Sequence, residues 1–179
     1  EKYLAEGVTM PEGLMERWRD EFDCIYLGAL GGPRVPSNVH AKEILLGARF
    51  QLDLYINLRP IKLLDSRYCP IKNKGPDDLD IMVFRENTEG LYTGIGGQFK
   101  RDTPDEGAIE AEMNTRKGVE RIIRAAFAYA DQHGKTRVCM SDKSNAMRHG
   151  HDLWQRTFKS VAAEYPSIEP SHLYVDVLA

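Results

Sequence analysis

Three arginines and a tyrosine have the types and the spacing needed to hold a small polycarboxylate and move a proton on it. Arg85 and Tyr92 stand seven residues apart, between an apolar run and a glycine-containing turn. Arg59 ends an earlier apolar run, and Arg49 stands ten residues before it. A guanidinium fork binds carboxylates through paired hydrogen bonds. For one arginine a surface ion pair is the commoner role, but placement at element ends favours a ligand site, because open α/β sheets bind ligands there.

Two further charged residues follow apolar runs nearer the C-terminus. Lys143 lies in a turn after the run 137–140, where a solvated loop charge is the ordinary interpretation. Beside a cationic pocket its pKa would fall, and it could then transfer protons. Asp176 is a lone carboxylate in the apolar run 173–178 and is either a solvent-facing residue or a ligand for a hard divalent cation. For Tyr92 the ordinary alternative is a half-buried packing residue.

The composition is that of a soluble globular domain. The chain has 179 residues, 42% hydrophobic and 28% charged, with a net charge of -3, which argues against a nucleic-acid-binding surface. No apolar run approaches the roughly 18 residues of a membrane span, and the start lacks a signal-peptide layout. We therefore expect a cytoplasmic protein. Cys24 and Cys139 lie in apolar runs and are expected to be buried free thiols.

These residues must be positioned by alternating strands and helices, a pattern that predicts an α/β fold. Strands are expected at 24–30, 52–58, 80–84, 136–140 and 171–178, and Pro60 should end the second of them. Helices are expected at 11–22, 41–50, 116–132 and 149–164. The glycine-rich segment 94–114 breaks the pattern and suggests a hairpin arm.

The helix 116–132 has the clearest signature. Its apolar residues recur at helical spacing and form one stripe: Val119, Ile122, Ile123, Ala126, Phe127 and Ala130. Asn114 or Thr115 can cap its start, and Gly134 can close its end. We expect this helix to supply much of the core.

Five segments, in order along nearly the whole chain, resemble the β-decarboxylating dehydrogenases, which act on 3-isopropylmalate, isocitrate, homoisocitrate and tartrate or D-malate. They are the segments 28–33, 53–60, 85–92, 142–145 and 175–176. The resemblance implies an isocitrate/isopropylmalate dehydrogenase-like fold, which is not a Rossmann fold, so the lack of a G-x-G-x-x-G motif is expected. It also implies that 1–58 belongs to a first domain and 59–179 to a second, which carries the arm and helices of a dimer interface.

The resemblance implies roles for the residues introduced above. Arg49, Arg59 and Arg85 correspond to the arginines that bind the substrate carboxylates. Tyr92 corresponds to the acid that protonates the enol carbon after decarboxylation.

The remaining matched residues would act in the partner subunit of a homodimer. Lys143 corresponds to the residue on the base side of the reaction, and Asn145 to a contact with the nicotinamide or the substrate. Asp176 corresponds to a metal ligand. The implied reaction oxidises a 2-hydroxy acid with NAD, or NADP, and uses Mg²⁺ or Mn²⁺ as a Lewis acid.

Differences between this chain and the branches of the family limit the possible substrates but do not identify a single one. Glu43 and Leu45 stand where isocitrate enzymes carry serine and asparagine, which argues against isocitrate. Leu45 and Leu46 resemble the pair that lines the isopropyl pocket, although the malate branch can also carry it. Lys42 replaces a glutamate expected in isopropylmalate enzymes. The sequence of residues 85–90 is more similar to that of the isocitrate and tartrate/malate branches. We expect a D-malate/tartrate or 3-isopropylmalate type of substrate.

The matched segments leave out parts of the family pattern. The N-terminal Gly-Asp-Gly-Ile-Gly strand has no counterpart here, nor do two further metal-binding aspartates and the adenosine-binding loops. We therefore expect a partial chain that is inactive alone. A non-catalytic, polycarboxylate-binding regulatory relative is the alternative, but it need not keep both Tyr92 and Lys143, and both are present.

Overall fold

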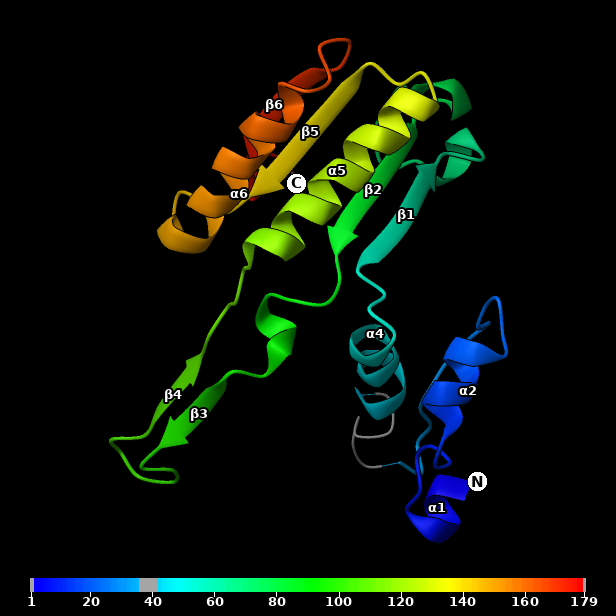
Figure 1. Ribbon diagram of the computed structural model, residues 1–179, viewed down its shortest axis with the longest axis vertical. Helices are drawn as coiled ribbons and strands as arrows, with labels where there is room; N and C mark the ends of the chain where they lie inside the picture. Colours follow the sequence, from blue (N-terminus) through cyan, green and yellow to red (C-terminus); the bar gives the residue numbers. More distant parts are fainter. Residues whose placement is uncertain (1, 36–41, 179) are drawn as a thin grey trace. The chain divides into compact units, whose positions relative to one another are not determined.

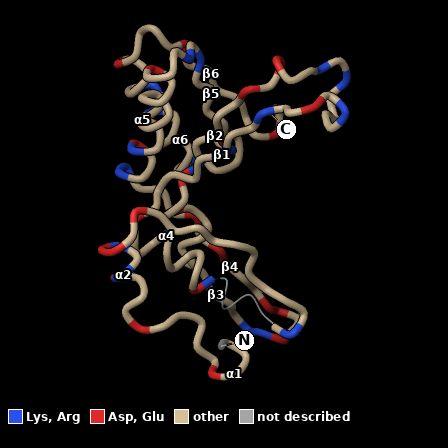
Figure 2. The backbone as a smooth tube through the Cα atoms, turned by 90° about the vertical axis from the view of Figure 1, so that its right-hand side faces the viewer, with Lys and Arg blue, Asp and Glu red and all other residues tan. Residues whose placement is uncertain are grey.

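A computed structural model describes residues 2–35 and 42–178. The chain divides into two compact units, Glu1–Leu54 and Tyr55–Ala179, which are described separately below. Figure 1 shows the helices and strands of each unit. Both acidic and basic residues occur along the backbone of each unit (Figure 2). No helix in the described ranges has the length and apolar character to cross a membrane.

The first unit is helical in its described residues. It contains α1 (Lys2–Glu6), α2 (Leu14–Asp20), a π-helical turn η1 (Lys42–Leu46) and α4 (Gly47–Gln51). Helix α2 follows Gly13, whose φ of 72° is left-handed, rather than starting at Pro11. Its buried residue is Met15, whereas Phe22, the last residue of the predicted helix, lies beyond α2 and is 51% exposed. Met15 lies over Gly47 of α4, where a Cβ would be 3.4 Å from the Met15 Cε, an ordinary van der Waals distance.

The prediction of a strand at 24–30 is wrong. These residues adopt no regular structure, and Tyr26 is 99% exposed. A strand needs a partner for its backbone groups, and every strand pair in the described part of the chain lies in the second unit. The buried-thiol prediction is also wrong, because Cys24 and Cys139 are exposed.

The second unit begins with an antiparallel pair, β1 (Ile56–Lys62) and β2 (Asp80–Glu86). Short 3₁₀ turns, η2 (Ser66–Tyr68) and η3 (Pro76–Asp78), lie between them. Pro60 was predicted to end this strand, but it lies inside β1 and pairs with Met82. Proline is compatible with an edge strand, and β1 has one strand neighbour in its two-stranded sheet.

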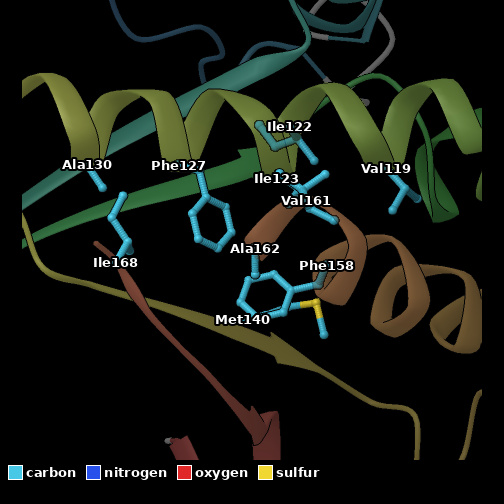
Figure 3. Packing of buried hydrophobic residues seen from close by; sticks show 10 residues of the cluster. All are labelled: Val119, Ile122, Ile123, Phe127, Ala130, Met140, Phe158, Val161, Ala162 and Ile168. Atoms are coloured by element: carbon cyan, nitrogen blue, oxygen red, sulfur yellow. The ribbon is translucent and has the colours of Figure 1, made fainter. Parts of the chain in front are cut away.

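Two helices, one strand and a residue just before a second, parallel strand form the core of this unit. Helix α5 (Arg116–Gln132) has the predicted bounds, and Thr115 caps it by accepting a hydrogen bond from the Gly118 N–H at 3.0 Å. Strand β5 (Arg137–Asp142) leads into α6 (Arg148–Ala162) and then into β6 (Glu169–Tyr174), parallel to β5. Figure 3 shows the buried cluster that they share: Val119, Ile122, Ile123, Phe127, Ala130, Met140, Phe158, Val161, Ala162 and Ile168. The predicted stripe of α5 is confirmed, except that Ala126 is only partly buried.

The unit also contains a short strand pair and a short C-terminal helix. Strands β3 (Gly96–Phe99) and β4 (Gly107–Glu110) pair antiparallel within the segment predicted to be an arm. After β6 the chain turns into a short helix, α7 (Val175–Leu178). Asp176 therefore lies just beyond the strand end, not inside the strand as expected.

Candidate active site

The antiparallel pairing of β1 and β2 places Asn57, Arg59 and Arg85 on one face of the ribbon. Asn57 lies opposite Arg85, and Arg59 is two residues further along β1. Directly opposed residues and residues two apart share a face of a sheet. The alternate residues Ile56 and Phe84 pack on the core cluster around α5. One face thus anchors the ribbon, which leaves the other for the two arginines.

A chain of amide hydrogen bonds orients Arg59. Its Nε donates to the Asn57 Oδ1 at 2.7 Å, and the Asn57 Nδ2 donates to the Asn87 Oδ1 at 3.3 Å. Asn87 is buried, and its backbone N–H donates to the Tyr55 carbonyl at 3.0 Å. Because these bonds use Nε, they direct the exposed guanidinium without occupying its two terminal nitrogens.

Arg85 and Tyr92 contact each other. The Arg85 Cζ lies 5.1 Å from the centre of the Tyr92 ring, a cation–π distance. Tyr92 is in the 3₁₀ turn η4 (Leu91–Thr93) and is 49% exposed. The turn follows Gly90, whose φ of 77° favours glycine and whose N–H donates to the Met113 carbonyl at 2.8 Å. A phenol and two guanidinium groups are therefore accessible on one surface.

Two glutamates of the same motif, to which the sequence analysis gave no role, hold this surface in place. The Glu86 carboxylate accepts hydrogen bonds from the backbone N–H groups of Thr88 and Glu89, at 2.9 and 2.7 Å. Glu89 accepts from the Thr115 N–H at 2.8 Å, at the start of α5. A Cβ on Gly118 would lie 2.4 Å from that carboxylate. The sequence feature that could have indicated the Glu89 contact is Gly118, three residues after the cap Thr115, because it leaves room for the carboxylate.

A second group of predicted residues meets at the carboxyl ends of the parallel strands β5 and β6. The Lys143 Nζ lies 2.5 and 2.6 Å from the two carboxylate oxygens of Asp176, and the Asn145 Nδ2 donates to the Asp176 Oδ2 at 3.2 Å. The Lys143 hydrogen bond, and then that of Asn145, hold the pKa of Asp176 below its usual value. Asp176 is therefore a carboxylate at neutral pH.

Beneath this group, a buried carboxylate stabilises the turn. The Asp142 Oδ1 accepts from the Ser144 N–H at 3.0 Å and contacts the His172 Nε2 at 2.9 Å. Burial alone would raise the pKa of Asp142, but the bonds from Ser144 and His172 together outweigh it and lower the pKa. Gln155 of α6 donates to the Ser144 Oγ at 2.5 Å. None of Ser144, Gln155 and His172 was singled out by the sequence analysis.

Within the described residues, no hydrogen bond or ion pair joins Arg59, Arg85 or Tyr92 to Lys143 or Asp176. The other two predicted residues, Leu45 in η1 and Arg49 in α4, are partly buried and belong to the Glu1–Leu54 unit.

Asp176 offers two hard oxygen atoms of the kind that Mg²⁺ and Mn²⁺ prefer. Across the residues that the structure describes, no three His, Cys, Asp or Glu side chains gather into a metal-binding group. Asp176 suits a divalent ion by its chemistry but supplies only part of a ligand set. Asn145 is the one predicted cofactor contact, and its amide is 3.2 Å from Asp176.

Comparison with known sequences places the whole chain in one family. The profile described as "Isocitrate/isopropylmalate dehydrogenase" matches residues 2–179. A 3-isopropylmalate dehydrogenase from Thermobifida fusca is 40% identical over 176 residues, which are 98% of this chain and 49% of that protein. One from Bifidobacterium longum is 42% identical, with 98% of this chain and 50% of that protein aligned. The chain spans about half the length of the curated relatives it matches.

Solved structures show the same relationship. The crystal structure of an isocitrate dehydrogenase from Methylococcus capsulatus matches with a TM-score of 0.77 and 29% identity, over 99% of this chain and 50% of that one. A protein from Thermus thermophilus matches with a TM-score of 0.80 and 30% identity, over 98% of this chain and 34% of that one. By sequence and by fold, this chain belongs to the isocitrate/isopropylmalate dehydrogenase family.

Proposed function

We propose that the protein carrying this chain catalyses the NAD-dependent, divalent-metal-dependent oxidative decarboxylation of a 2-hydroxy dicarboxylic acid. The substrate would be of the 3-isopropylmalate or the D-malate/tartrate type. The observation that carries this proposal is the contact of Lys143 and Asn145 with Asp176 at the ends of two parallel strands. There Lys143 would transfer protons and Asp176 would bind the cation. The dehydrogenase names of the relatives support it.

The arginine face would bind the substrate. Arg59 and Arg85 share one face of the β1–β2 ribbon, and each can hold a carboxylate through two hydrogen bonds. Arg49 would add a third cation, and Leu45 would contact the substituent that distinguishes one 2-hydroxy acid from another. Binding both carboxylates fixes the orientation of the carbon that is oxidised.

Lys143 and Tyr92 would move the protons. Lys143 would accept the proton of the substrate hydroxyl, and a nicotinamide cofactor would supply the acceptor for the hydride of the same carbon. The resulting keto acid loses CO₂, and Tyr92 donates its phenolic proton to the enol carbon left behind. A bound Mg²⁺ or Mn²⁺ would polarise the substrate oxygens, and Asp176 would be one of its ligands.

The active site would be shared in a homodimer, as the family resemblance implies. Lys143, Asn145 and Asp176 of one subunit would complete the arginine face of the other. The dimer and the cytoplasmic location stay predictions.

A substrate panel on the complete protein tests the proposal. NADH formation should appear with 3-isopropylmalate, D-malate or tartrate, only with Mg²⁺ or Mn²⁺ present, and isocitrate should be the poorest substrate. Because the relatives quoted above are named 3-isopropylmalate dehydrogenases, that acid is the first to test. Binding of these acids without turnover, under all metal and cofactor conditions, would instead identify a non-catalytic relative.

A further inference from the structure

His151 links the Lys143 turn to the chain that returns from the β3–β4 hairpin. Its Nδ1 lies 2.7 Å from the backbone nitrogen of Lys143, and its Nε2 lies 3.3 Å from the Glu112 Oε1. The His151 and Glu112 side chains are 13% and 17% exposed. The residue is in the first turns of α6, and no sequence motif drew attention to it.

The chemistry of these contacts determines where the ring proton sits. A backbone N–H can only donate, so the Nδ1 facing Lys143 must carry a lone pair and no proton. The remaining ring proton is then on Nε2, where it points at a carboxylate oxygen of Glu112. Glu112 thereby selects the tautomer that leaves Nδ1 ready to accept the Lys143 N–H.

The same contacts hold the turn from both sides. The Lys143 carbonyl accepts hydrogen bonds from the N–H groups of Ala146 and Met147, both at 2.9 Å. The Lys143 N–H is bound by His151 on the following helix. With both backbone groups held, the Lys143 side chain starts from a defined point, and its Nζ meets both oxygens of Asp176.

We propose that His151, oriented by Glu112, is a positioning residue that sets the backbone of Lys143 and so places its amine for proton transfer. His151 does not itself touch the reacting atoms. The catalytic part of this inference rests on the proposed function, whereas the tautomer and the hydrogen bond do not.

Two substitutions at His151 distinguish the contribution of Nδ1 from that of Nε2. In His151→Asn the new amide oxygen can replace Nδ1 and accept the Lys143 N–H, but the shorter side chain cannot reach Glu112. His151→Gln can present an amide N–H near the Nε2 position and contact Glu112, but it offers no acceptor at Nδ1. His151→Ala removes both contacts. His149, exposed on the same helix, provides matched controls in His149→Asn and His149→Gln.

In the complete protein we expect kcat to fall about 10- to 100-fold in His151→Gln and His151→Ala, with a smaller change in KM. His151→Asn should keep kcat within about threefold of the parent, since a single retained hydrogen bond suffices to place the turn. Equal kcat values in the Asn and Gln variants would overturn the inference. So would losses that merely follow each variant's thermal stability.

A spectroscopic test is independent of turnover. The ¹⁵N shifts of His151 should show a protonated Nε2 and a bare Nδ1, and Glu112→Ala should populate the other tautomer. A dominant Nδ1–H form in the parent protein would overturn the inference. If Lys143→Ala kept full activity while the tautomer was as expected, the role of Lys143 in proton transfer would fail, and with it the catalytic part of this inference, whereas the hydrogen-bond assignment would stand.

Discussion

Lys143 and Asp176, 33 residues apart in sequence, form a two-oxygen ion pair with Nζ–O distances of 2.5 and 2.6 Å. They follow neighbouring parallel strands, β5 and β6, at the edge where ligands of α/β proteins usually bind. Both side chains are substantially exposed, so the pair contributes little to folding. The Asn145 carboxamide lies beside the pair. We therefore interpret the three residues as a functional site and not as a stabilising interaction.

Removing the Lys143 amine tests its assigned role in the proposed reaction. Lys143→Ala should lower kcat by about 10²- to 10⁴-fold, the range for loss of a general acid–base group. Lys135→Ala is the matched control, because Lys135 also pairs with an exposed carboxylate, Asp80, at 2.8 Å. Steady-state rates of NADH formation give the answer, and similar kcat values for both variants would exclude Lys143 from proton transfer.

The metal prediction concerns Asp176. Asp176→Asn should raise the Mg²⁺ or Mn²⁺ concentration needed for half-maximal activity by roughly the 10- to 100-fold typical of losing metal-site support. Chelation should abolish the activity of the parent protein, and added Mn²⁺ should restore it. Asp80→Asn serves as the control. Unaltered metal titrations in Asp176→Asn would refute the assignment.

The buried carboxylate Asp142 should make stability depend on pH. Because its folded pKa lies below the ordinary value, the carboxylate form stabilises the fold at every pH above about 4. That contribution is lost as the pH falls through the lowered folded pKa.

The corresponding variant is Asp142→Asn. It should lower the free energy of unfolding by about 1–3 kcal/mol at pH 7, the cost of disturbing a buried hydrogen-bonded group. The deficit should shrink once the pH drops below about 4. Urea unfolding at several pH values measures it, and a deficit that stayed constant down to about pH 2 would contradict the assignment.

Gly118 offers a test in which two physical effects have opposite signs. Helix propensity alone would make Gly118→Ala stabilising by about 1 kcal/mol. The structure predicts a loss instead, of about 1–3 kcal/mol, because the new Cβ would lie 2.4 Å from the Glu89 carboxylate. Glu89 could move away only by giving up its hydrogen bond from the Thr115 N–H at 2.8 Å. Lys117→Ala, exposed on the same turn, should be nearly neutral. Thermal unfolding distinguishes the two, and a stabilised Gly118→Ala variant would show that Glu89 can move away at no cost.

Elements with a strong local signal were predicted well. Helix α5 has the predicted bounds because its apolar spacing, its threonine cap and its terminal glycine all agree. The strand expected at 24–30 is absent and Pro60 lies inside a strand, since strands depend on partners that are distant in sequence. Local patterns carry little information about such partners.

The candidate site shows the same division. Residue types and motif order identified Arg59, Arg85 and Tyr92 as possible ligand-binding groups, because a guanidinium or a phenol has the same chemistry in any fold. Their joint surface depends on the β1–β2 register, in which Asn57 faces Arg85. A shift of one residue would have turned Arg59 toward the core.

The sequence alone established the family, the chemistry of the charged residues and the long helix, all of which follow from local order along the chain. Folding established which groups meet: Lys143 with Asp176 across two parallel strands, and His151 with both Lys143 and Glu112. Those contacts depend on strand register, turn geometry and a histidine tautomer. Each is set by packing between distant segments, so no pattern of neighbouring residues could have revealed it.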